Sequence, residues 1–163
     1  MKKIMVFLLL LGSINGFSKI HEVKMLNKGT NGEKMVFEPQ ILFIKKGDQV
    51  KFIPTDRSHN VMSISKKGGL PKGAKKWKGK TSKPHIQKFT VEGVHPIKCR
   101  PHMAMGMIGA IVVGKPNNLA VLKKLRLIGK AKKRFKDILK KIELDHSIVI
   151  SSATLKKVIN GEY

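Results

Sequence analysis

The amino-acid sequence predicts a mainly β fold: a sandwich or barrel of short strands, followed by two helices. Across residues 19–115, short apolar segments are separated by turn residues, a pattern that is typical of sandwiches and barrels. After Gly114 the apolar residues take on helical spacing. The length of 163 residues suggests one domain, and the 41% of hydrophobic residues excludes a disordered polycation.

The first 18 residues, MKKIMVFLLLLGSINGFS, predict a secretory signal peptide. Two lysines precede the apolar run Ile4–Leu11, and the small residues Gly16 and Ser18 have the spacing that a signal peptidase requires. The alternative is a buried strand or helix. Cleavage after Ser18 would leave 32 basic and 10 acidic residues, a formal charge of +22. We therefore expect a very basic exported protein without a transmembrane span, because no apolar run reaches 18 residues.

Eight strands are expected in the β region, residues 19–115. Turn pairs such as Gly47–Asp48 and Glu92–Gly93 separate some of them. The expected strands are Ile20–Leu26, Met35–Phe37, Ile41–Ile44, Val50–Ile53, Asn60–Ile64, Ile86–Val91, Pro96–Cys99 and Ile108–Val113. The segment 65–85, which is rich in lysine and glycine, is expected to be a long surface connection.

Two helices are expected in residues 116–142. The first follows Pro116 and runs to about Leu127, where Gly129 separates it from the next. The second runs from about Ala131 to Ile142 and carries apolar residues on one face. Residues 143–163 mix polar and apolar side chains, and we assign them no structure and no role.

The segment KCRPHMAMGM concentrates three soft or borderline metal ligands in one loop. Cys99, His102 and Met107 have the spacing C-x2-H-x4-M. Copper accepts thioether as well as thiolate, whereas zinc rarely binds methionine. His59, at the start of an expected strand, can supply a second imidazole. Two histidines and one cysteine with a distant methionine form a blue-copper ligand set.

Each of these residues alone has a simpler explanation. A lone cysteine is most often a small buried hydrophobic residue, and a lone methionine fills a core. The joint spacing is more specific than its parts, but Met103 and Met105 leave the choice of methionine open. The single cysteine excludes an intramolecular disulfide and sites that need several cysteines. The histidines at 21, 85, 95 and 146 stand apart and are expected at the surface.

Five stretches carry a resemblance to a known family. They are VKMLNKG (23–29), MVFEP (35–39), FIPTDRSHNV (52–61), LPKGAKKWKGK (70–80) and IKCRPHMAMGMIGAIVVG (97–114). Over nearly all of 19–142 the chain resembles the pseudoazurins, small blue copper proteins of the cupredoxin family. The resemblance implies a cupredoxin Greek-key β-sandwich on which the two C-terminal helices pack. The chain continues past the end that is usual for this family.

The resemblance also implies the ligands of one type 1 copper ion: His59 in the HNV motif, Cys99, His102, and the methionine after glycine, Met107. Around them, the amide of Asn60 would donate to the Cys99 sulfur, and the Asn60 side chain would tie the two ligand loops together. Pro101 has no N–H and cannot donate to that sulfur.

As a function, the resemblance implies a periplasmic electron shuttle with acidic redox partners, such as a nitrite reductase or another periplasmic reductase, and a cytochrome c donor. A basic rim and a small apolar patch would dock the partner, and a monomer is expected. The docking residues expected are Lys28, Met35, Arg57, Lys72, Lys75, Lys76 and Met103.

Three other functions compete with the shuttle. A copper-binding or storage protein without a dedicated redox partner is the main alternative. Nucleic-acid binding is disfavoured because the chain has one Trp and one Tyr for base stacking and is exported. A cysteine hydrolase built on Cys99 and His102 lacks an oxyanion or orienting motif, and a complete ligand set leaves no open coordination position. We therefore expect no enzyme.

Overall fold

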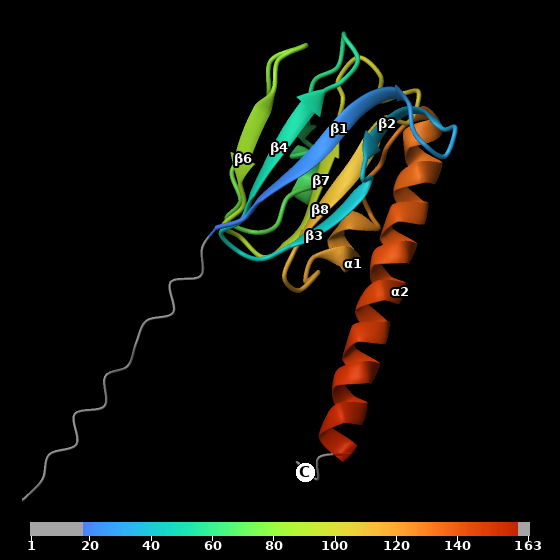
Figure 1. Cartoon of the computed structure of the whole chain (residues 1–163). Helices are drawn as coiled ribbons and strands as arrows, with labels where there is room; N and C mark the ends of the chain where they lie inside the picture. The colour runs from blue at the N-terminus through green and yellow to red at the C-terminus, as the bar shows by residue number, and fades with distance from the viewer. Residues whose placement is uncertain (1–17, 160–163) are drawn as a thin grey trace, which may run out of the picture.

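The computed structural model describes residues 18–159, and these form two packed β-sheets with a long helix along one side (Figure 1). The predicted signal peptide lies outside the described residues, apart from Ser18. No helix within residues 18–159 is both long enough and apolar enough to cross a membrane.

Each sheet contains four strands, and a strand is present at each of the eight predicted places. Two predicted bounds are wrong: β5 is shorter than 60–64, and β6 ends at Lys88 instead of Val91. The first sheet has the order β2 (Lys34–Glu38), β1 (Ile20–Lys28), β4 (Gln49–Pro54) and β6 (His85–Lys88). The second has the order β3 (Ile41–Ile44), β8 (Ile108–Val113), β7 (Gly93–Lys98) and β5 (Met62–Ser63). Each sheet mixes parallel and antiparallel pairs, with β1 parallel to β4 and β3 parallel to β8. This mainly β, two-sheet architecture with C-terminal helices has the layout that the resemblance implies.

Two cores hold the molecule together. The first lies between the sheets and includes Phe37, Phe52 and Ile111. The second lies on the outer face of the second sheet, where Val112 packs with Phe135 of the long helix. All six residues of β8 are buried because that strand contributes to both cores, so its sequence is apolar throughout instead of alternating.

The helices differ from their predicted bounds. α1 spans only Leu119–Leu122 instead of running to about Leu127. Asn118, just before it, uses its side chain to bond both backbone groups of Val94, which anchors the start of α1 to the sheet. α2 spans Gly129–Ile159, so the predicted end near Ile142 is wrong. Residues 143–159 contain no proline or glycine that would stop a helix once begun.

The strand directions bring two segments together at one end of the sandwich, which we call the ligand end. Residues 55–61 follow β4 and residues 99–107 follow β7. The opposite end contains the β3–β4 turn at residues 45–48 and the β6–β7 turn at 89–92, joined by a hydrogen bond from the Gly47 N–H to the Phe89 carbonyl. α2 begins at the ligand end, because the Lys130 N–H donates to the carbonyl of Ala104.

Candidate metal centre

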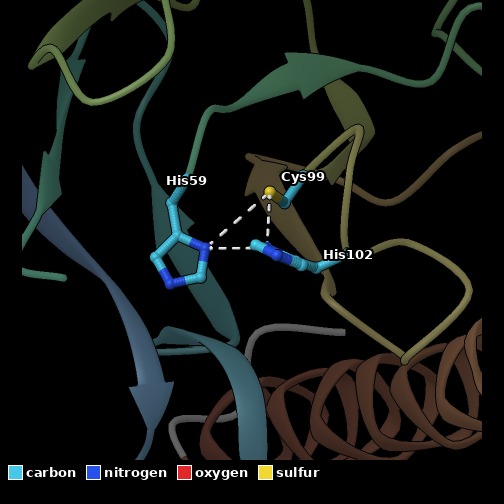
Figure 2. Close-up of side chains that lie close together, drawn as sticks. All are labelled: His59, Cys99 and His102. Carbon is cyan, nitrogen blue, oxygen red and sulfur yellow. Dashed lines mark hydrogen bonds between the residues drawn. The ribbon is translucent and has the colours of Figure 1, made fainter. Parts of the chain in front are cut away.

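Three side chains converge at the ligand end, as Figure 2 shows. The Nδ1 atoms of His59 and His102 lie 3.1 Å apart, and the Sγ of Cys99 lies 3.9 Å and 3.6 Å from them, respectively. Within residues 18–159 this is the one group of three His, Cys or carboxylate side chains close enough to share a metal ion. Two imidazole nitrogens and one thiol sulfur, with no carboxylate, are a donor set that fits copper.

His59 is fixed by a contact from the first sheet. Its ring is fully buried, and its Nε2–H donates to the Oδ1 of Asn27, next to the end of β1, over 3.0 Å. That bond leaves the Nδ1 lone pair free to face Cys99 and His102. Burial, helped by the nearby His102, lowers the pKa of His59, so the ring is held in the neutral form that binds metals. The sequence analysis missed Asn27, because nothing in the sequence links it to a residue 32 positions away.

Cys99 is fully buried directly after β7. Its N–H donates to the carbonyl of Met107 over 3.1 Å, which closes the ligand loop. Burial raises the pKa of the thiol, while the backbone N–H groups of Asn60 and His102 counteract that rise. The thiol therefore keeps its proton until a cation displaces it.

Asn60 joins the two ligand-bearing segments. Its buried side-chain oxygen accepts a 2.8 Å hydrogen bond from the N–H of Arg100, beside Cys99, while its own N–H faces the Cys99 sulfur. Pro101 is exposed and offers no N–H, so the second amide at the sulfur comes from His102.

The three methionines of the loop occupy different surroundings. Met107 is fully buried in the same core as Cys99, and its N–H donates to the carbonyl of His102. Met103 is half-buried and packs against the core of the helix side, whereas Met105 is 48% exposed. Of the three, Met107 alone shares its core with the thiol.

Arg134 of α2 holds the ligand loop from outside. Its Nη1 donates to the carbonyls of Gly106 (2.7 Å) and Met35 (3.1 Å), and its Nη2 pairs with the carboxylate of Glu33 (2.9 Å). Gly106 has a φ of +99°, and a Cβ there would lie 3.2 Å from the guanidinium. The sequence analysis missed Arg134, because no motif distinguishes it from the other basic residues of 129–142.

The expected docking residues separate into two groups. Lys28 and Arg57 are exposed at the ligand end, with half-buried Met35 packed on the core that contains Cys99. Lys72, by contrast, lines a cavity with Lys46 and Glu92 at the opposite end.

Lys75 lines another cavity, with Val91 and His95, and exposed Lys76 is its neighbour in the chain. The structure does not bring Lys72 and Lys75 to His102. The connection 65–85 leaves β5, passes the opposite end at Leu70 and Lys72, and returns beside β5, where the Gly79 N–H bonds the Val61 carbonyl.

The sequence analysis expects the remaining histidines at the surface, and this prediction is wrong for at least one of them. His95 is 4% exposed within β7 and donates to the carbonyl of Val91 over 2.7 Å. His21 bonds the carboxylate of Asp48 over 2.8 Å, and His85 stacks on Trp77. Each of these three has a structural partner that explains its position.

Comparison with known proteins places these observations in a family. The family of copper binding proteins described as plastocyanin/azurin matches residues 23–114, which include all four expected ligands. A pseudoazurin of Paracoccus pantotrophus is 43% identical over 120 residues, which cover 73% of this chain and 81% of the relative.

Solved structures agree with the sequence matches. A pseudoazurin from Sinorhizobium is 42% identical with a TM-score of 0.73, over 77% of this chain and 97% of that one. Native pseudoazurin from Hyphomicrobium denitrificans is 41% identical with a TM-score of 0.70, over 75% and 97%. Both solved chains are matched almost completely, so this chain contains segments without a counterpart in them.

Proposed function

Because this chain belongs to the plastocyanin/azurin family of copper-binding proteins and is a blue copper electron-transfer protein, we propose that it shuttles single electrons in the periplasm to an acidic reductase. A nitrite reductase is the partner we propose, with a cytochrome c as donor. The observation that carries the proposal is the convergence of His59, Cys99 and His102, with only His102 partly exposed.

In this proposal His59, Cys99, His102 and Met107 hold the copper. When bound, copper supplies a one-electron couple between Cu(II) and Cu(I). The chain keeps the donor atoms in place in both states, because Asn27 fixes the His59 ring and Asn60 ties the two ligand segments together. Burial of Cys99 and Met107 keeps water away from the sulfur ligands.

A partner would dock around His102, the ligand that reaches the surface. Exposed Pro101 and half-buried Met35 and Met103 would supply the apolar contact. Three exposed basic residues would flank this patch. They come from the end of β1 and from the two ligand-bearing segments: Lys28, Arg57 and Arg100. Charges of this kind act mainly on the rate of encounter, because they attract an acidic partner before contact.

Stopped-flow electron transfer to an acidic nitrite reductase tests the proposal. We expect the triple variant Lys28→Gln, Arg57→Gln, Arg100→Gln to slow the second-order rate several-fold at low salt, with the reduction potential nearly unchanged. The matched control, Lys72→Gln, Lys75→Gln, Lys76→Gln, removes the same charge mostly from the opposite end and should slow it less. High salt should reduce the difference.

Two results would contradict the proposal. Equal slowing by both triple variants would mean that net charge alone matters and that no docking face exists at the ligand end. Loss of copper on reduction, without reoxidation by the reductase, would instead favour a copper storage protein.

A further inference from the structure

The last four turns of α2 expose a row of large apolar side chains. Leu144, Ile148, Leu155 and Ile159 are 59%, 57%, 62% and 80% exposed. They are spaced by four, seven and four residues, so they share one side of the helix. We call these four residues the outer stripe. It lies on another side of the helix from the sandwich-facing row, which includes Phe135, Ile138 and Ile142 and continues to Val149 beside Phe43. Figure 1 shows the C-terminal end of α2 extending beyond the sandwich.

The charge of this segment differs from that of the rest of the protein. Residues 143–159 contain two acidic and two basic residues and are formally neutral, in a chain of formal charge +24. Residues 129–142, in contrast, contain seven basic residues and one acidic residue. A surface that is selected to bind anionic lipid would carry its lysines beside the apolar side chains, so the neutral stripe fits a protein partner better than a membrane.

The spacing of the outer stripe is symmetric about the bond between Ser151 and Ser152. In an antiparallel pair of identical helices centred there, Leu144 faces Ile159 and Ile148 faces Leu155, while the two small serines meet at the centre. A two-fold interface requires this kind of self-complementary surface. We propose that the outer stripe binds a second copy of this chain in an antiparallel helix pair.

Charges at the edge of the stripe match in the same arrangement. Asp145 and exposed Lys156 are eleven residues apart, which is three turns, so both lie on the same flank of the helix. The two-fold axis places Lys156 of one copy opposite Ser147 of the other copy. Asp145 of that other copy is about 3 Å further along the helix axis, so the two opposite charges lie close together. The Ser152 hydroxyl already donates to the carbonyl of Val149, so burial would not leave it unpaired.

The size of the stripe sets the strength of the pair. Sixteen helical residues span about 24 Å, which is less contact than the roughly 800 Å² per partner of a standard interface. We therefore expect a weak, reversible dimer, unlike the monomer that the sequence analysis expects. The two ligand ends would lie at the far ends of the helix pair, and both would stay open to redox partners.

Sedimentation velocity of the copper-loaded protein over a concentration series tests the pair. The weight-average mass should rise toward twice that of the monomer, and more steeply at high salt, which screens the repulsion between two basic chains. The double variant Ile148→Ser, Leu155→Ser should stay monomeric. The control Val121→Ser, Ile128→Ser removes exposed apolar residues outside the stripe, 47% and 71% exposed, and should dimerise like the parent. An unchanged blue absorption verifies the fold of each variant.

Cross-linking tests the register. With a short bis-maleimide, Ser151→Cys should give covalent dimers, because each copy of residue 151 lies beside the two-fold axis. Ser147→Cys should give few, because its two copies are separated by nine residues, about 13 Å along the axis. Cys99 is buried in every variant and provides the background.

Three results would overturn the proposal: a monomer at all concentrations and salts, equal dimerisation of the stripe variant and the parent, or equal cross-linking at residues 147 and 151. Binding of the monomer to vesicles containing anionic lipid, lost in the Ile148→Ser, Leu155→Ser variant and weakened by salt, would also overturn it, because a membrane would then be the occupant.

Discussion

The two halves of α2 form one continuous helix in different surroundings. Residues 129–142 bury Ala131, Phe135 and Ile138 against the second sheet and send Arg134 to the ligand loop. Residues 143–159 expose most of their large apolar side chains. A helix that is already formed extends without tertiary contacts, because propagation costs much less than nucleation. The first half therefore supports the metal centre, whereas the second half is available for another purpose.

The largest effect should come from a substitution in the ligand loop, residues 99–107, which Arg134 in the first half of α2 contacts. We expect Cys99→Ser to abolish the intense blue absorption of the copper-loaded protein, because only a thiolate produces the sulfur-to-copper band. The fold should persist, since both cores consist mainly of other side chains. Visible absorption and circular dichroism measure the two outcomes. A variant that is still blue would refute the assignment of Cys99 as ligand.

Removing one apolar side chain from each half of α2 should lower the free energy of unfolding by very different amounts. Phe135→Ala empties a position that is 3% exposed and should lower the free energy of unfolding by about 3–5 kcal/mol. Leu155→Ala, at 62% exposure, should change it by less than about 0.5 kcal/mol. Urea unfolding of dilute protein gives both values. Similar losses would mean that the second half packs on the sandwich.

Replacing a basic side chain should affect stability and the metal centre in the first half of α2, but not in the second half. Arg134→Met removes hydrogen bonds from a side chain that is 17% exposed and should cost about 1.5–3 kcal/mol of unfolding free energy. It should also shift the visible spectrum and the reduction potential, because Gly106, next to Met107, loses its anchor.

Lys156→Met is the matched variant in the exposed half of α2. It should leave the visible spectrum and the reduction potential unchanged. Arg134→Lys should restore only part of the effect, because lysine lacks the planar fork of donors. If Arg134→Met left the spectrum and the potential of the parent intact, Arg134 would have no positioning role.

The smallest effect is expected at the opposite end of the sandwich, away from both halves of α2. It concerns how the stability of the fold depends on pH. The hydrogen bond from His21, together with the Lys19 and Lys45 amides, lowers the pKa of the Asp48 carboxyl. A lowered folded pKa stabilises the protein above the ordinary pKa of aspartate, near 3.9. Stability should therefore fall as the pH drops below about 4. Asp48→Asn should flatten this part of the pH profile in urea unfolding, and an unchanged slope would contradict the assignment.

The sequence predicts what depends on neighbouring residues and misses what depends on distance in space. Cys99 and His102 are three positions apart, so their joint role is visible in the motif. The hydrogen bonds from His59 to Asn27 and from Arg134 to Gly106 join residues that are 32 and 28 positions apart, and no periodicity in the sequence marks them.

The errors in the sequence analysis have related causes. Lys72 is predicted as a docking residue from the resemblance, and no strand pattern in 65–85 fixes its path; in the structure it lines a cavity at the opposite end. The full length of α2 is missed because residues 143–159 mix polar and apolar side chains, and most of the large apolar ones lie outside the row that faces the sandwich.

The bond between His59 and Asn27 determines where protons go when copper is taken up. His59 is already neutral, with its one ring proton committed to Asn27 and its other nitrogen bare, so it has no proton to lose. The Cys99 thiol, whose pKa is raised by burial, still carries its proton. Loading at neutral pH thus draws one proton from the sulfur and none from His59, and the buffer receives the acid.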